Sequence, residues 1–282
     1  METLGKIKPI EESRLLYSFC KNELDSVFKS LYTKYDSITA VNSREVGIYK
    51  HVKKLLPCFD LLYKISSTSS IQSLKTMERM IVDNYAILFL LSSHSTEQEQ
   101  NLRYYLYLLD AVKSRTNIIN SFSTEIPDEI PQEIMSNANS AKDADQETYN
   151  DIKELIKDVK LDSLVNENII EKCNWKYKDG KKSNGRNCYS WVELYQIAKI
   201  PKRHAQVLQD YHSSYVHGLG ISLMIGDDDN LLPIIKSTLD FCSILQTMII
   251  KILMTSFFKE TRDIKLPESM SAFMNKNWDD WK

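Results

Sequence analysis

Glycine and proline are scarce in this chain, since each occurs only seven times in 282 residues. A β-sandwich or barrel of this length needs many more turn residues, so the scarcity argues against an all-β fold and favours helices. Acidic and basic residues nearly balance, giving a formal net charge of −2. That charge gives no general attraction for phosphate backbones or anionic membranes, so any contact with nucleic acid must come from a local basic patch.

Motifs that bind metals or cofactors are missing as well. The five cysteines are scattered, and no Cys-x-x-Cys pair occurs, which argues against a zinc ribbon or a disulfide framework. The sequence has no P-loop, dinucleotide-binding, His-Glu-x-x-His or nucleophile-elbow motif. We therefore expect no metal and no cofactor. A metal-dependent enzyme built on scattered His and Asp residues is a weaker alternative, because no ligand spacing supports it.

The N-terminal residues lack the apolar core of a signal peptide. The most apolar stretch, residues 241–258, includes the polar residues Gln246, Thr247 and Lys251. This polarity predicts a buried core helix in preference to a membrane span. We therefore expect a cytoplasmic protein without a membrane partner.

Apolar residues recur at steps of three and four through most of the sequence, which is the period of one helix face. The pattern predicts an all-α fold, a multi-helix bundle of about eight helices. It breaks between residues 121 and 147, where two prolines precede the polar run SNANSAKDADQE. We interpret 121–147 as a surface excursion or linker. It separates a helical half at 1–120 from a second half at 148–282, and we expect the two halves to pack as one domain.

Hydroxyl groups and histidines cluster where one predicted helix ends, just before Gly218. Tyr211, Ser214 and His217 follow one another at steps of three and therefore share a helix face. A histidine titrates near neutrality and can act as a general base, while the two hydroxyls can orient a phosphate or water. A buried histidine that hydrogen-bonds an opposite helix would give the same pattern.

An arginine and an aspartate lie four residues apart inside a strongly apolar segment. Arg79 and Asp83 form this pair within the run MERMIVDNYAILFLL. On a solvent-exposed face such a pair is common and contributes little. If it faces the core, other polar groups must satisfy it, and His217 is one candidate.

A loop between residues 174 and 188 is rich in lysine and also contains aromatic residues. Basic and aromatic residues together suit a single-stranded nucleic acid, through charge and base stacking. An ordinary solvated loop explains the composition equally well. The candidate nucleic-acid-binding residues are Lys178, Lys181, Lys182 and Arg186.

These motifs together resemble those of a bacterial family of unknown function. An Arg-x-x-x-acid pair in an apolar helix, a Trp-containing segment and Tyr-x-x-Ser-x-x-His-Gly at a helix end follow one another in this order. The helical bundle of that family is similar to HEPN domains, the higher-eukaryote and prokaryote nucleotide-binding superfamily. The resemblance spans roughly residues 45–258 and implies a HEPN-like core. The corresponding residues are Arg79, Asp83, Trp191, Tyr211, Ser214 and His217.

Many HEPN proteins are metal-independent ribonucleases of toxin–antitoxin, abortive-infection and other phage-defence systems. Their site is an Arg-x(4–6)-His motif, usually assembled across a homodimer. This sequence departs from that motif, because His212 stands five residues before His217 and the nearest upstream arginine, Arg203, is fourteen residues away. A nuclease of this kind would take its cation from Arg79, Arg203 or protonated His212.

The leading hypothesis is a HEPN-like defence or toxin protein that acts on RNA as a metal-independent ribonuclease. His217 would be the general base, Arg79 beside Asp83 would stabilise the anionic transition state, and Tyr211 and Ser214 would position the phosphate. The resemblance also implies a homodimer and a partner protein such as an antitoxin. The alternative is a non-catalytic helical module that senses a nucleotide or binds a protein. In that module Arg79, Asp83 and His217 form a buried structural network.

Overall fold

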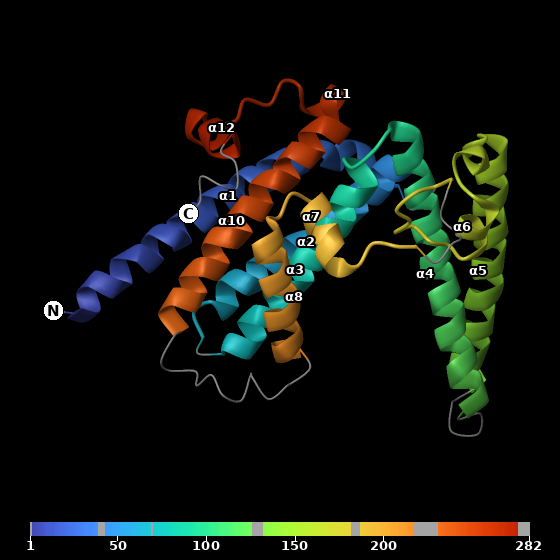
Figure 1. Cartoon of the computed structure of the whole chain (residues 1–282), viewed down its shortest axis with the longest axis horizontal. Helices are drawn as coiled ribbons and strands as arrows, with labels where there is room; N and C mark the ends of the chain where they lie inside the picture. Colours follow the sequence, from blue (N-terminus) through green and yellow to red (C-terminus); the bar gives the residue numbers. More distant parts are fainter. Residues whose placement is uncertain are drawn as a thin grey trace. The chain divides into compact units, whose positions relative to one another are not determined.

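The structure is a computed structural model that describes residues 2–38, 43–68, 70–125, 132–181, 187–216 and 231–275. Within these ranges the chain forms eleven α-helices and one short 3-10 helix, with no β-strand (Figure 1). The all-α prediction is therefore confirmed. The number of helices exceeds the expected eight because several helices are only one or two turns long and because a helix replaces the expected linker.

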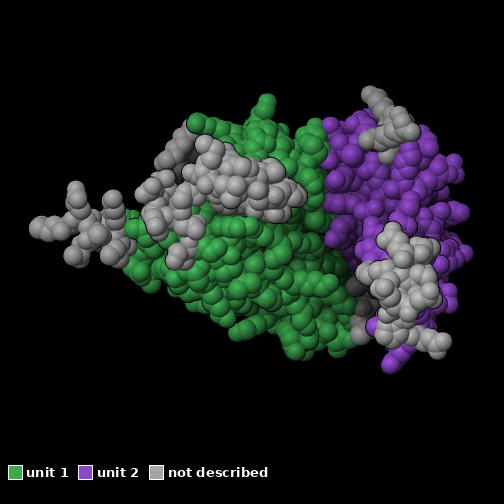
Figure 2. Space-filling view, turned by 90° about the horizontal axis from the view of Figure 1, so that it is seen from below, with its two compact units in different colours: residues 1–94, 190–282 green, residues 95–189 purple. Residues whose placement is uncertain are grey.

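The chain divides into two compact units, shown in different colours in Figure 2. Unit 1 consists of residues 1–94 and 190–282, and unit 2 of residues 95–189, so the boundaries differ from those expected at 120 and 147. The helices of unit 1 are α1 (Glu2–Tyr35), α2 (Arg44–Ile65), α3 (Ile71–Ser92), α7 (Trp191–Ile197), α8 (Lys202–Val216), α10 (Leu231–Ser256), α11 (Phe258–Thr261) and α12 (Glu268–Asn275). Those of unit 2 are α4 (Glu97–Glu125), α5 (Gln132–Asp158), the 3-10 helix η1 (Leu161–Leu164) and α6 (Glu167–Glu171).

Helix α10 forms the core of unit 1. Thirteen of its residues are buried, and it packs against α1, α2 and α3 (Figure 1). Among the described helices it is also the one that is long and apolar enough to cross a membrane, but 67% of its most apolar window is buried inside the protein. Its burial confirms the prediction of a core helix.

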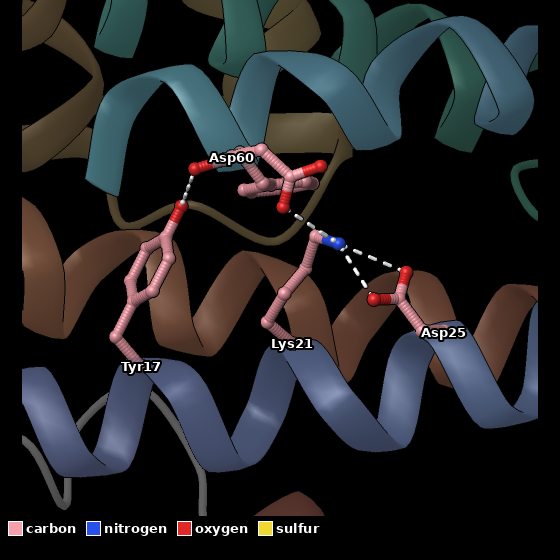
Figure 3. A network of polar contacts seen from close by, with 5 residues as sticks. Tyr17, Lys21, Asp25 and Asp60 are labelled. Atoms are coloured by element: carbon pink, nitrogen blue, oxygen red, sulfur yellow. Dashed lines mark hydrogen bonds and ion pairs between the residues drawn. The ribbon is translucent and has the colours of Figure 1, made fainter. Parts of the chain in front are cut away.

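A polar network joins α1 to α2 at the edge of this core (Figure 3). The Lys21 ammonium donates to both oxygens of Asp25, at 2.9 and 2.7 Å, and lies 3.0 Å from Asp60 Oδ1. One helical turn earlier, the Tyr17 hydroxyl donates to the Phe59 carbonyl at 2.8 Å. Lys21 is buried, so its two carboxylate partners offset the loss of its hydration.

Helix α5 occupies most of the segment that the sequence indicated was an excursion or linker. Seven of the less exposed positions of α5 are spaced alternately by three and four residues, so they form one continuous helix face. These positions are Met135, Ala138, Lys142, Asp145, Tyr149, Ile152 and Ile156. The linker interpretation failed because Lys142 and Asp145 interrupt the apolar pattern on the face that packs inward.

The inward position of Asp145 is explained by a partner on α4, the helix against which α5 packs. Asp145 is almost fully buried, and Arg115 binds it side-on: Arg115 Nε donates to Oδ2 at 2.6 Å, and Nη2 approaches Oδ1. A buried carboxylate needs such a partner, because its hydration is lost on folding. This ion pair therefore lets a polar residue occupy a core position of the α4–α5 pair.

Gly180 lies where the loop that follows α6 approaches η1 closely. A Cβ atom at Gly180 would lie 2.7 Å from the Leu164 carbonyl oxygen and 2.9 Å from Val165 Cγ1. The Gly180 carbonyl also accepts a hydrogen bond from Asn166 N at 2.6 Å. The backbones therefore approach so closely that only glycine fits.

We expect Gly180→Ala to lower the free energy of unfolding by about 1–3 kcal/mol, because the backbone of η1 must move to make room for the methyl group. Urea unfolding followed by circular dichroism would measure the change. An unchanged unfolding midpoint would contradict the close approach.

His51 on α2 is held against the backbone of α3. Its Nε2 lies 3.0 Å from the Asn84 carbonyl oxygen, to which it can donate a hydrogen bond. Burial is the main cause that lowers the pKa of His51 to about 4, and the charge of Lys54 lowers it further. Since an unfolded histidine titrates near 6.5, protonation favours the unfolded state.

We therefore expect full stability above pH 6.5 and a loss as the pH falls from 6.5 toward 4. The His51 contribution should amount to about 2 kcal/mol at pH 5. In His51→Gln the amide can still donate to Asn84 but does not titrate, so the difference in unfolding free energy between pH 7 and pH 5 should shrink by that amount. Equal pH dependence of the wild type and His51→Gln would contradict this account.

Candidate functional site

Three helices of unit 1 meet around the Arg79–Asp83 pair: α3 packs against both α7 and α8, and α7 packs against α8. Helix α7 begins at a capping box, in which the Ser190 side chain accepts from Glu193 N and the Glu193 carboxylate accepts from Ser190 N. This box fixes where the helix starts. Its start determines which α7 side chains face α3.

Arg79 and Asp83 form a close ion pair on α3. Arg79 Nε donates to both carboxylate oxygens of Asp83, at 2.9 and 2.8 Å. The two side chains are 14% and 24% exposed, so the pair lies partly within the protein. A pair in this position is stronger than an exposed one, because less water screens it.

Tyr195 of α7 completes this cluster. Its hydroxyl donates to Asp83 Oδ1 at 2.5 Å, and Arg79 Cζ lies 5.9 Å from the centroid of its ring. Burial, followed by the nearby charge of Asp83, raises the pKa of Tyr195 well above its usual range, so the hydroxyl stays protonated and donates. Asp83 thus accepts hydrogen bonds from two sides, and the Arg79 guanidinium is held between its carboxylate and the ring.

Tyr195 was not among the site residues predicted from the sequence. It follows Trp191 by four residues, and the two rings pack with their centroids 6.3 Å apart. Because Trp191 and Tyr195 are four residues apart, both rings lie on one face of the helix. That signal could have identified Tyr195, although nothing in the sequence pairs it with Asp83.

A second polar pair on α3 faces α10 and is buried. Lys75 Nζ donates to Glu78 Oε2 at 2.6 Å and to Thr238 Oγ1 at 2.8 Å, and Thr238 Oγ1 donates to Glu78 Oε2 at 2.9 Å. The side chains of Lys75 and Glu78 are only 8% and 4% exposed. None of Lys75, Glu78 and Thr238 was among the site residues predicted from the sequence. This pair fixes the face of α3 that packs against α10. It therefore also fixes the side of α3 on which Arg79 lies.

The remaining predicted catalytic residues belong to α8 and the segment after it. His217 lies outside the described residues. Tyr211 and Ser214 lie on α8, of which only the backbone is described at these positions. The prediction that these three side chains gather around Arg79 therefore stays a prediction.

Two of the four predicted nucleic-acid-binding residues, Lys182 and Arg186, also lie outside the described residues. Lys178 and Lys181 are described, and both contact their own unit: Lys178 Nζ lies 5.9 Å from the Tyr189 ring centroid, and Lys181 Nζ donates to the Ser163 carbonyl. These lysines therefore already make contacts within the fold.

The aromatic residues of this loop hold it against α4. Trp175 and Tyr177 are buried, and Trp175 Nε1 donates to Asp110 Oδ2 at 3.2 Å. The buried Arg103 donates to the carbonyls of both Trp175 and Tyr177, at 2.9 and 3.0 Å, and stacks on the Tyr177 ring with Cζ 3.7 Å from its centroid. Stacking of bases on Trp175 or Tyr177, one basis of the nucleic-acid prediction, is not supported by this burial.

Among the residues that the structure describes, no group of three or more His, Cys, Asp or Glu side chains could hold a metal ion. Comparisons with protein-family models, with curated proteins and with solved structures found no match. The residues of the site are therefore the basis for any functional proposal.

The Tyr195–Asp83 hydrogen bond can be tested by removing the hydroxyl alone. We expect Tyr195→Phe to lower the free energy of unfolding by about 2 kcal/mol, because Asp83 loses a charge-assisted hydrogen bond in a partly buried position. The measurement is urea unfolding at pH 7.

Tyr85→Phe is the matched control, since Tyr85 is equally buried and its hydroxyl donates to the neutral Ala198 carbonyl at 2.9 Å. We expect a smaller loss there, of about 1 kcal/mol. If Tyr195→Phe loses no more unfolding free energy than the control, the acceptor of the Tyr195 hydroxyl is not the charged Asp83 carboxylate.

Proposed function

We propose that this chain is a HEPN-like defence or toxin protein that acts on RNA as a metal-independent ribonuclease. In this proposal Arg79 stabilises negative charge on the phosphate, and Asp83 and Tyr195 hold its guanidinium in place. His217 acts as the general base, and Tyr211 and Ser214 position the phosphate. The proposal also includes a homodimer and an antitoxin-type or other defence partner, both of which the HEPN-like resemblance implies.

One observation supports this proposal above the others. Asp83 and Tyr195, 112 positions apart in the sequence, join Arg79 in one cluster beside α8, the helix that leads to His217. The Arg-x-x-x-acid and Trp-containing segments of the resemblance are thus neighbours in space. A guanidinium that is already oriented stabilises a developing anion without reorganising during the reaction.

The chemistry requires only the RNA and side chains of this chain. The general base removes the proton of the ribose 2′-hydroxyl, whose oxygen forms a bond to the adjacent phosphorus as the bond to the 5′-oxygen breaks. The leaving 5′-oxygen takes up the proton that the general base removed, and the product ends in a 2′,3′-cyclic phosphate. Arg79 would stabilise the extra negative charge on the phosphorus while both bonds are partly formed.

A second function is favoured by a different property of the same cluster. Asp83 neutralises Arg79, and the buried Tyr195 closes the cluster on one side, as a structural network would. A non-catalytic module that senses a nucleotide or binds a protein needs no further cation. This module would bind its ligand without turnover.

The two functions differ in what His217→Ala does. For the ribonuclease, cleavage of RNA should proceed in EDTA, and His217→Ala should reduce it by about 100-fold or more with little change in melting temperature. Arg79→Lys, which keeps the charge but loses the planar guanidinium and its Nε donor, should be impaired as well. Activity and melting temperature are measured on the same preparations.

For the non-catalytic module, the wild type should cleave none of the RNAs tested. His217→Ala should then lower the melting temperature markedly, because a buried partner loses its hydrogen bond. This pair of results would reject the ribonuclease.

A further inference from the structure

Four residues with basic side chains lie within six positions where α7 turns into α8. Lys199 directly follows the α7 C-cap, and Lys202, Arg203 and His204 form the start of α8. All four side chains are exposed, and none makes an ion pair with any residue that the structure describes. We call these four residues the α8 basic cluster.

The stability of α8 does not explain the α8 basic cluster. Basic groups in the first turn of a helix oppose the positive end of the helix dipole, and acidic groups are favoured there. The first turn of α8 contains no acidic residue to offset them. The cluster neither pairs with acids of the described chain nor suits its helix, so its charges are available to an external anion.

The backbone that presents the cluster is firmly anchored. The Ala198 carbonyl accepts from the buried Tyr85 hydroxyl of α3, and Ile200 N donates to the Tyr195 carbonyl at 2.9 Å. Ile200, between Lys199 and Lys202, and Ala205, directly after His204, are buried. The positive charges are therefore held at a fixed place in unit 1, next to Tyr195 of the candidate site.

The lysine-rich loop of unit 2 differs in this respect. Lys176 and Lys178 lie 5.6 and 5.9 Å from the ring centroids of Trp175 and Tyr189, and Lys181 donates to the Ser163 carbonyl. These three cations are engaged within their own unit. An external anion would have to compete with those contacts, whereas it would meet no such competition at the α8 basic cluster.

We infer that the α8 basic cluster binds the phosphate backbone of single-stranded RNA. The strand then follows α8, which is about 22 Å long and packs against α3, the helix that carries Arg79. This inference rests on the proposed action on RNA and deepens it, because it names the surface that captures the substrate. A short row of exposed cations without large apolar anchors suits a flexible polyanion, which is bound by charge.

The test measures binding of a fluorescent fifteen-nucleotide uridine strand with 2′-O-methyl groups, which cannot be cleaved through the 2′-oxygen. The triple variant Lys199→Gln/Lys202→Gln/Arg203→Gln removes three charges from the cluster. Lys176→Gln/Lys178→Gln/Lys181→Gln removes the same charge from the loop and is the matched control. Fluorescence anisotropy at several salt concentrations gives the affinity and its salt dependence.

We expect the cluster variant to bind at least tenfold more weakly at 0.1 M salt, and its slope of log affinity against log salt to fall by about two. The loop variant should stay within about threefold of the wild type. No binding by the wild type, or a loss in the loop variant as large as in the cluster variant, would overturn the inference. Competition by polyglutamate as strong as that by RNA of equal charge would also overturn it, because the cluster would then serve acidic proteins.

The inference and the proposed ribonuclease can fail separately. If ordinary RNA is bound through the cluster but never cleaved, the inference stands and the ribonuclease is rejected. If the wild type cleaves RNA and the cluster variant cleaves it with an unchanged KM, the ribonuclease stands and the inference is rejected.

Discussion

The buried ion pair of α3 is the constraint on which the arrangement of unit 1 depends. Lys75 and Glu78 have lost nearly all contact with water, and they are satisfied by each other and by Thr238 of α10. Breaking such a pair by removing one partner is far more destabilising than losing an apolar contact, because a charge is left without water or a partner. Rotation of α3 by one residue, about 100°, would leave both charges buried without their partners. The pair therefore fixes one rotation of α3 against the core helix.

That rotation determines where the candidate site lies. Arg79 and Asp83 lie about 90° around α3 from the Lys75–Glu78 pair, on the side where α7 and α8 pack. There Asp83 meets the hydroxyl of Tyr195, and the Arg79 guanidinium is held against the carboxylate. The two pairs on one helix thus have different roles, since one is sealed within the core and the other lies partly exposed beside the helix that leads to His217. Partial exposure is what a binding site requires and what a purely structural pair does not.

Two charged residues of unit 2 are buried and contribute to its folding. Arg103 is buried against the backbone and ring of the aromatic loop, and Asp145 is buried against Arg115. Both are charged residues at positions where an apolar side chain would ordinarily pack, and both make directed hydrogen bonds there. The basic residues at the start of α8, in unit 1, make no such bonds with the residues that the structure describes. The number of basic residues in a segment is therefore a poor guide to binding, because it does not show which charges the fold already uses.

The sequence by itself determined that the chain is all-α, because helix periodicity depends on near neighbours, and it identified Arg79 and Asp83 through their spacing of four. It also identified the apolar stretch of α10 as a core helix. It misjudged α5, because Lys142 and Asp145 stand on the inward face and only the neighbouring α4 explains why they are tolerated there. Tertiary structure alone brings Tyr195 to Asp83 and Thr238 of α10 to Lys75. Each is a contact between helices distant in sequence, and no local pattern of residues specifies which side chains such helices bring together.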